Sequence, residues 1–467
     1  MSDWFEGARF GMFIHWGHPS QRGWELFWPL VGGMRAPPRD RGCTARGLMR
    51  RATLAALVLA MAACGDSHPT PVEQAAPVVP AAAEPEPRPL HRCFADRPTW
   101  EEAPVDDLLA RASRLLDDSD DDTALACAEE AAHQEPRSIE AHETRAFALA
   151  GLRRHDDARD AMALALAIAP DDAFTLESAA DLYLNRLPPS GERSAIGLEY
   201  ARRARRGVKR GDKPRRAHLA LLEGEALNDL GRAGEALRRL DAALVLRPDD
   251  DDARFERGVA LFDLCRLDEA RRELARVVAA DPAHAHAHHH LGLIAERASD
   301  EATSARELAE ATRLDPKAFP PPPAVSPADF DARVRAAVAA LPEATRRELA
   351  EVPVETAELP LVEDLVAEQP PLAPTILGLF RGLPLGADGE AGSGPAARGS
   401  KAGAGPDRGG DGPCEVPSRA IILYRRNLLR TVADEAALDR AITRTLLHEI
   451  GHLHGEDDAT LRDRGLE

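Results

Sequence analysis

The stretch from Pro248 to Pro282 decides the fold, and it reads PDDDDARFERGVALFDLCRLDEARRELARVVAADP. Its two prolines are 34 residues apart, and the same spacing separates Pro136 from Pro170, Pro214 from Pro248 and Pro282 from Pro316. Proline ends a helix, so each can mark the point where one helical unit gives way to the next. Only Pro170 to Pro214 is longer, at 44 residues, and we assign its ten extra residues to the polar stretches 187–191 and 209–213. A fixed period of this length indicates a repeat architecture.

Small residues recur at fixed distances from these prolines. Ten residues after each proline the chain has Ala146, Ala180, Gly224, Gly258 and Gly292. Further small residues follow at 22 residues (Ala158, Ala236, Ala270) and at 29 residues (Ala165, Ala243, Ala311). Small side chains let the two antiparallel helices of a hairpin approach closely. We therefore predict a mostly α fold, an α-solenoid of helical hairpins, with a small α+β domain after it at the carboxy terminus.

The periodic region, residues 104–319, resembles an array of tetratricopeptide repeats. The resemblance implies a superhelix whose concave face binds a peptide or another protein, and such a partner is expected here. The repeats carry acidic runs at their turns, as at 117–122 and 249–252, which we interpret as solvated loops.

The amino-acid composition argues against a nucleic-acid partner and against a β-sandwich fold. The 467 residues contain 59 Lys and Arg against 78 Asp and Glu, a formal net charge of −19. No basic stripe dominates, so a nucleic-acid partner is not expected. Aromatic residues make up 4% of the chain, and the 44% of hydrophobic residues are mostly Ala, Leu and Val, which favours helix packing over a β-sandwich.

Residues 1–33 contain Phe10-Gly11-Met12-Phe13-Ile14-His15-Trp16-Gly17, which resembles the amino-terminal strand of bacterial α-L-fucosidases, where the corresponding His contacts the sugar. The resemblance covers about 30 residues, whereas a (β/α)₈ glycosidase needs about 250. We interpret this fragment as a mis-joined gene start, with α-L-fucosidase activity as a remote alternative.

Residues 34–64 read as a bacterial lipoprotein signal. A basic start at Met49-Arg50-Arg51 precedes an apolar run, 52–63, that is too short to span a bilayer. The run ends in Ala-Ala-Cys64 and resembles a lipobox, so Cys64 is the expected lipidation site. This predicts export to the bacterial cell envelope, with the membrane contacted only through a lipid anchor. If the internal signal is unused, the protein is cytoplasmic.

Residues 65–103 are rich in Pro and Ala and are predicted to form a linker. After Cys64 the chain has Cys93, Cys127, Cys265 and Cys414, widely spaced and without a CxxC pair. An exported protein can oxidise them, but sequence gives no connectivity, and two free thiols would be unsurprising.

The pattern changes near Phe330. Helical periodicity covers 331–341 and 346–350, and short apolar runs at 352–354, 376–380 and 420–424 read as strands, the last two paired. Between those two, residues 386–413 contain ten glycines in 28 positions and are predicted to be a disordered insertion. An amphipathic helix is expected over 436–453.

That helix carries His448-Glu449-Ile450-Gly451-His452. Residues four apart share a helical face, so both imidazoles can reach one Zn²⁺, with Glu449 beside them. Gly455 can leave the helix with positive φ and bring Asp458 to the third ligand position. Spacing alone leaves His454, Glu456 and Asp457 as alternative third ligands.

Residues 328–467 resemble the zincin-like minimal zinc metallopeptidases of bacteria, over the stretches 351–354, 370–382, 421–428 and 445–452. The resemblance implies that His448, His452 and Asp458 are metal ligands and that Glu449 is the catalytic general base. The glycine-rich insertion and Leu453-His454 depart from the family pattern but remove no proposed ligand.

These observations predict an exported zinc-dependent peptidase whose repeats present protein substrates to a hydrolytic site, with Zn²⁺ as its cofactor. The alternative is a non-catalytic lipoprotein in which the repeats bind proteins and the zincin domain is vestigial.

Overall fold

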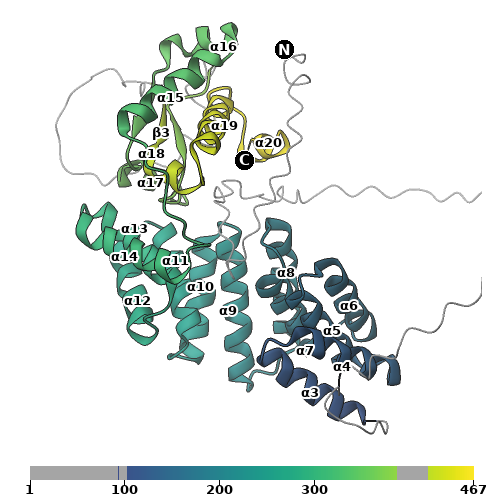
Figure 1. Cartoon of the computed structure of the whole chain (residues 1–467). Helices are drawn as coiled ribbons and strands as arrows, with labels where there is room; N and C mark the ends of the chain where they lie inside the picture. The colour runs from purple at the N-terminus through teal and green to yellow at the C-terminus, as the bar shows by residue number, and fades with distance from the viewer. Residues whose placement is uncertain (1–92, 94–102, 386–418, 467) are drawn as a thin grey trace, which may run out of the picture.

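The computed structural model describes residues 93, 103–385 and 419–466, and Figure 1 shows their arrangement. The fucosidase-like fragment 1–33, the signal region 34–64 with Cys64, and the segment 386–413 lie outside these residues, as does all of the linker 65–103 except Cys93 and Ala103. Among the described residues, no helix combines the length and apolar character needed to cross a membrane.

The first part of the described chain is a row of helices in which consecutive members pack against one another (Figure 1). They are α3 Val105–Asp117, α4 Asp121–Gln134, α5 Ile139–Gly151, α6 His155–Ile168, α7 Ala173–Asp181, the π-helical η1 Leu182–Arg186, α8 Gly191–Gly207, α9 Lys213–Asp229, α10 Ala233–Leu246, α11 Asp251–Asp263, α12 Leu267–Ala280, α13 Ala285–Arg297 and α14 Glu301–Leu314. The predicted solenoid of helical hairpins is confirmed.

Most of the periodic prolines stand where the sequence predicts. Pro248, for example, lies two residues after the end of α10, and Pro282 two residues after the end of α12. Pro214 differs, because it lies in the first turn of α9, where a missing N–H costs no helical hydrogen bond. The assignment of all ten extra residues to the two polar stretches is also wrong, since α8, which lies between Pro170 and Pro214, has 17 residues against 14 in α12, the corresponding helix of a later repeat.

Acidic turn residues begin several helices. The side chain of Asp250 accepts a hydrogen bond from the Ala253 N–H at 3.0 Å and thereby caps α11. Asp120 does the same for Thr123 at the start of α4. Asp250 is only 7% exposed, so its interpretation as a solvated loop residue is wrong. An aspartate at this position satisfies an amide that the helix cannot pair internally.

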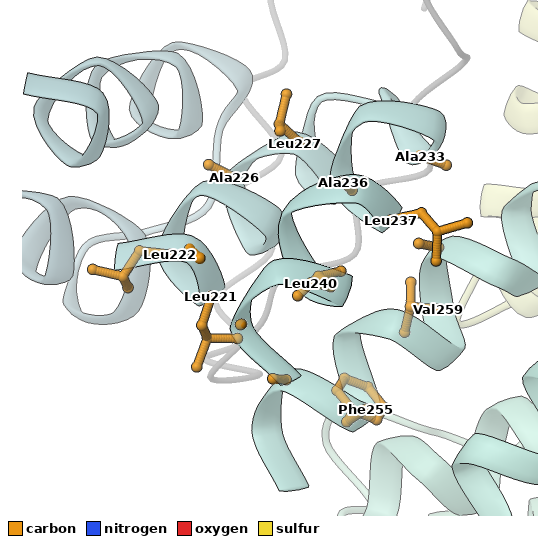
Figure 2. Close-up of a cluster of buried hydrophobic side chains, with 14 of the residues drawn as sticks. Leu221, Leu222, Ala226, Leu227, Ala233, Ala236, Leu237, Leu240, Phe255 and Val259 are labelled. Atoms are coloured by element: carbon orange, nitrogen blue, oxygen red, sulfur yellow. The ribbon is translucent and has the colours of Figure 1, made fainter. Parts of the chain in front are cut away.

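The small residues meet leucines of the partner helix. A Cβ added at Gly258 would lie 2.8 Å from Cγ and Cδ2 of Leu274, which is fully buried. Gly224 approaches Leu240 and Gly292 approaches Leu308 in the same way, and in each pair the leucine comes 16 residues after the glycine. Figure 2 shows part of the resulting core between α9, α10 and α11, in which Leu240, Phe255 and Val259 belong to one buried cluster.

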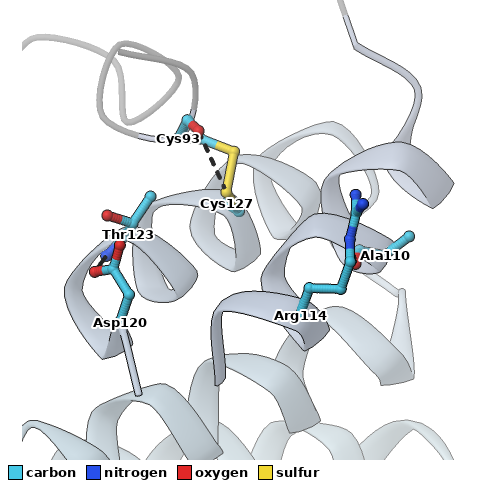
Figure 3. Close-up of a disulfide and its surroundings, with 6 residues drawn as sticks. All are labelled: Cys93, Ala110, Arg114, Asp120, Thr123 and Cys127. Atoms are coloured by element: carbon cyan, nitrogen blue, oxygen red, sulfur yellow. Dashed lines mark hydrogen bonds between the residues drawn. A yellow bond between two sulfur atoms is a disulfide. The ribbon is translucent and has the colours of Figure 1, made fainter. Parts of the chain in front are cut away.

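A disulfide joins Cys93 to Cys127 of α4 (Figure 3). It fixes the chain that precedes α3 onto the first described hairpin, where both sulfurs are buried with Leu108, Leu109 and Ala112. The spacing of the cysteines in the sequence does not favour this pair over the other possible pairs. Among the described cysteines, Cys265 is a free thiol.

The C-terminal unit lies against the α13–α14 end of the repeats (Figure 1). Its elements are α15 Pro327–Ala340, α16 Glu343–Glu348, the 3₁₀ turn η2 Leu349–Glu351, β1 Val354–Ala357, α17 Val362–Ala367, β2 Gly378–Arg381, β3 Ala420–Tyr424, α18 Arg425–Arg430, α19 Glu435–Leu453 and α20 Asp458–Asp463. The expected helices and strands are present, although the first strand begins at Val354, where the run 352–354 ends.

The three strands form one sheet in the order β1-β3-β2. β3 is central and buried along its whole length. It pairs in parallel with β1 (Val354 opposite Ile421) and antiparallel with β2 (Gly378 opposite Leu423), which confirms the predicted pairing of the last two strands. β2 is therefore an edge strand, and α19 packs against it.

We predict that Gly258→Ala destabilises the repeats, because the added methyl group overlaps the buried Leu274 side chain. Gly234→Ala is the matched control, since nothing lies within 4 Å of a Cβ at that helical glycine. Overpacking should leave Gly258→Ala about 2 kcal/mol less stable than Gly234→Ala. Urea unfolding followed by far-ultraviolet circular dichroism checks this. Equal midpoints for the two variants would contradict the close helix approach.

Candidate metal centre

The helix α19 presents the two histidines to the interior of the C-terminal unit. Asp434 caps its first turn by accepting a hydrogen bond from the Ala437 N–H at 2.7 Å. The buried face includes Leu438, Ile442, Leu446 and Ile450, and it sets the rotation of the helix. This rotation places His448 and Glu449 in the interior, each 1% exposed, with His452 one turn later.

The chain reverses after α19 in the way that Gly455 predicts. Its φ is +83°, a left-handed conformation that glycine adopts without steric cost. The Gly455 N–H donates to the His452 carbonyl and the Glu456 N–H to the Gly451 carbonyl, the two hydrogen bonds of a Schellman motif. Asp457 then caps α20, which places Asp458 at the first position of that helix.

The reversal brings three donor atoms together. His452 Nε2 lies 3.1 Å from His448 Nε2 and 3.2 Å from Asp458 Oδ1, and His448 Nε2 lies 3.5 Å from the same oxygen. Within the described part of the chain, these three residues form the group of His, Cys, Asp or Glu side chains arranged closely enough to hold a metal ion.

Both imidazoles are oriented by backbone carbonyl groups. His448 Nδ1 lies 3.0 Å from the Leu466 carbonyl oxygen, and His452 Nδ1 lies 3.0 Å from that of Glu456. A carbonyl only accepts, so each Nδ1 carries a proton, and the neutral form of each ring directs its Nε2 lone pair toward the cluster.

This donor set fits zinc. Two Nε2 lone pairs 3.1 Å apart repel each other unless a proton or a cation lies between them. Ligands about 2.0–2.1 Å from a tetrahedral zinc ion lie roughly 3.3 Å from one another, which matches the spacing of the three atoms. Two imidazoles and a carboxylate are also a common ligand set for catalytic zinc.

The electrostatics of the two acids differ. Burial acts to raise the pKa of Asp458, but His448 and His452, which donate to its carboxylate when Nε2 also carries a proton, hold that pKa well below its ordinary value. Burial raises the pKa of Glu449 to about 7, against the opposing influence of both histidines and of the Phe380 N–H. Asp458 is thus an anion suited to a cation, and Glu449 can exchange a proton near neutral pH.

The edge strand β2 lies directly against Glu449. A Cβ at Gly378 would sit 2.8 Å from Glu449 Oε1, so a larger residue would collide with the carboxylate. Glu449 Oε1 is buried and has no hydrogen-bond partner among the described residues. Sequence reasoning missed the roles of Gly378 and the Phe380 N–H, and of the Leu466 and Glu456 carbonyls, because backbone groups leave no signature in a motif.

The structure separates Asp458 from the alternative third ligands. His454 lies outside the cluster, with Nε2 3.0 Å from Glu348 Oε2. The Glu456 carboxylate pairs with Arg464, and that of Asp457 accepts from the N–H of Thr460 at 2.9 Å. Of the four candidates, only Asp458 contacts both histidines.

We predict that Asp458→Ala lowers zinc affinity by roughly two orders of magnitude or more, since the loss of one of three protein ligands exceeds the effect of an outer partner. His448→Ala and His452→Ala should behave alike. His454→Ala removes a neighbouring imidazole outside the cluster and should bind zinc as the unaltered chain does. Competition with a chromophoric chelator measures each affinity. Unchanged affinity in Asp458→Ala would exclude it as the third ligand.

Comparison with known proteins agrees with this division of the chain. A family model described as a tetratricopeptide repeat matches residues 227–296, and one described as a zincin-like metallopeptidase matches residues 391–466. No curated protein matches the chain.

Several solved structures are similar to the repeats. YrrB, a tetratricopeptide-repeat protein with an unusual peptide-binding site, is 24% identical, with 40% of this chain and 92% of YrrB covered and a TM-score of 0.30. PilF of Pseudomonas aeruginosa is 18% identical, with 45% and 92% covered and a TM-score of 0.38. PilW, a type IV pilus biogenesis factor, is 20% identical, with 45% and 94% covered and a TM-score of 0.40.

The family models, the helical hairpins and the His448-Glu449-x-x-His452 helix converge on one description. The chain combines a tetratricopeptide-repeat region with a C-terminal zincin-like metallopeptidase domain.

Proposed function

We propose that the protein is an exported zinc-dependent peptidase that binds protein substrates through its repeats. The observation that carries this proposal is the convergence of His448 Nε2, His452 Nε2 and Asp458 Oδ1 beside the buried Glu449 carboxylate. A metal that is only structural needs no proton acceptor at its side, whereas peptide hydrolysis does.

Zinc, when bound, supplies a Lewis acid that polarises the scissile carbonyl and acidifies a water molecule. His448, His452 and Asp458 would hold the ion, and the Leu466 and Glu456 carbonyls would keep both rings in place. Glu449 would take a proton from the attacking water and give it to the leaving amine. Burial raises the pKa of Glu449 above its ordinary value, the direction that favours proton acceptance.

The edge strand β2 supports an extended peptide as the substrate. Its pairing with β3 uses one edge, and among the described residues no strand pairs with the other. A substrate in extended form can add to such an edge through main-chain hydrogen bonds, with little dependence on its sequence. Because Gly378 of β2 lies so near Glu449 that a Cβ would not fit between them, a peptide bound there would place its backbone near the proton acceptor.

The repeats would then supply the affinity that a bare edge strand lacks. Tetratricopeptide arrays generally bind proteins or peptides on their concave face. The net charge of −19 makes a nucleic-acid partner unsuitable.

The disulfide between Cys93 and Cys127 supports export, because such bonds persist in oxidising compartments and are rare in the cytosol. A lipid anchor at Cys64 would place the repeats and the zincin domain in the cell envelope. The bond lies 29 residues after that cysteine, at the start of the described chain.

Glu449→Gln is predicted to keep zinc and lose hydrolysis. The substitution preserves the helix, the side-chain size and all three ligands but removes the proton acceptor, so cleavage of unfolded casein should fall by roughly two orders of magnitude or more. Glu348→Gln, an exposed carboxylate partnered with His454, is the control and should leave cleavage unchanged. Full zinc occupancy without cleavage by the unaltered chain would favour the non-catalytic adaptor.

Cys64→Ser is predicted to abolish lipid attachment and to release the protein from membranes when it is expressed in a bacterium. Mass spectrometry of the native chain should find Cys64 as the lipidated first residue, with Cys93 and Cys127 joined. A protein that keeps Met1, remains in the cytoplasmic fraction and carries reduced thiols would exclude export.

A further inference from the structure

The last repeat is joined to the zincin domain by buried charges. Glu296, near the end of α13, has a side chain that is 5% exposed and accepts hydrogen bonds from Arg426 Nη1 at 2.7 Å and Arg430 Nη2 at 2.5 Å. Both arginines belong to α18 of the zincin domain. A buried carboxylate with two matched guanidinium groups favours one relative orientation, because moving the domains apart would leave a buried charge without its partners.

The next residue, Arg297, reaches further into the zincin domain. Its guanidinium donates from Nη1 to the Pro360 carbonyl oxygen at 3.2 Å and from Nη2 to that of Pro374. Burial lowers the pKa of Arg297 to about 10, so the side chain stays charged at neutral pH. A charged donor buried on two carbonyl groups holds them more firmly than an exposed one would.

Pro374 is also held from the other side. Asn427 of α18, which is 4% exposed, donates from Nδ2 to the Pro374 carbonyl oxygen at 3.1 Å and to the Ile376 carbonyl oxygen at 2.7 Å. One carbonyl therefore accepts from the repeats and from the zincin domain together. The segment 374–377 is thus clamped between them.

This segment leads directly into the edge strand. The Tyr424 N–H donates to the Leu377 carbonyl at 2.9 Å, and β2 begins at the next residue, Gly378. Gly378 is the residue at which a Cβ would collide with Glu449. Three residues separate Pro374, whose carbonyl is held by Arg297, from Gly378, the strand residue against the proposed general base.

Apolar packing crosses the same junction. Cys265, in the turn between α11 and α12, packs on a cluster of the zincin domain made of Leu365, Leu372, Ile376, Ile422 and Tyr424. Its thiol lies 3.6 Å from the Leu372 carbonyl oxygen. The turn of one repeat thereby covers the core on which the segment 374–377 rests.

We infer that Arg297 is a positioning residue for the peptidase site: the last repeat holds the segment 374–377 and so fixes β2 against Glu449. The inference rests on the proposed function. It makes the repeats a part of the hydrolytic machinery in addition to a surface that binds substrate. Removing the guanidinium releases one side of the clamp while the three metal ligands, all on α19 and α20, stay in place.

The test compares Arg297→Ala with Arg306→Ala in the full chain. Arg306 lies on α14, where its side chain is 67% exposed and pairs with Glu307, away from the clamp. Hydrogen exchange of peptides covering 374–381 should quicken at least about tenfold in Arg297→Ala and stay unchanged in Arg306→Ala. Zinc content should be equal in both variants.

Kinetics separate positioning from general loss of structure. At full zinc occupancy, kcat for an unfolded protein substrate should fall roughly 10- to 100-fold in Arg297→Ala, with little change in KM, since a small displacement of reacting groups has an effect of this size. Arg297→Lys keeps the charge and can reach one carbonyl, so it should recover part of both the exchange protection and kcat. If Arg297→Ala folds poorly, the exchange protection and kcat of Arg297→Lys still test the positioning role.

Hydrogen exchange and kcat distinguish failure of the positioning role from failure of the peptidase function. Unchanged exchange in 374–381 for both Arg297 variants would overturn the positioning role, whatever the activity. Faster exchange together with unchanged kcat would also overturn it. Faster exchange in a chain that never cleaves any substrate would support the clamp and would refute the peptidase function instead.

Discussion

The close approach of paired helices across a glycine is the constraint on which the rest of the structure depends. Gly258 admits Leu274 to a distance that no Cβ would allow, and the same contact recurs 34 residues earlier and later. Because the contact is repeated, the helices of the hairpins α9–α10, α11–α12 and α13–α14 pack with the same close approach. This regular packing places α13 near the end of the array, where Glu296 and Arg297 contact the zincin domain.

The sequence predicted what depends on period and spacing. The solenoid, the pairing of β2 with β3 and the helix bearing His448 and His452 all follow from patterns within single segments. Asp458 could be placed near the histidines because a glycine turn has few conformations. Its choice over His454 needed the structure, because neighbouring side chains on a reversing chain point in different directions.

What the sequence could not predict depends on contacts between distant segments. The bond from Cys93 to Cys127 joins a residue before the first hairpin to the second helix, and spacing does not rank such pairs. Arg297 looks like any arginine at the end of a helix, a position where a cation is ordinary. Only the fold shows that its partners are carbonyl groups of the segment before β2.

The two buried charged clusters differ in how their charges are matched. At the junction, Glu296 already has two arginine partners, so the cluster is complete without any ligand and serves to orient two units. In the zincin domain, Asp458 lies against two imidazoles whose Nδ1 protons are committed to carbonyls, so its negative charge is matched by a proton on Nε2 or by a cation. Burial makes unmatched charge costly. The same fold thus closes one cluster, which can hold the domains together, and leaves the other with donor atoms arranged closely enough to hold a cation.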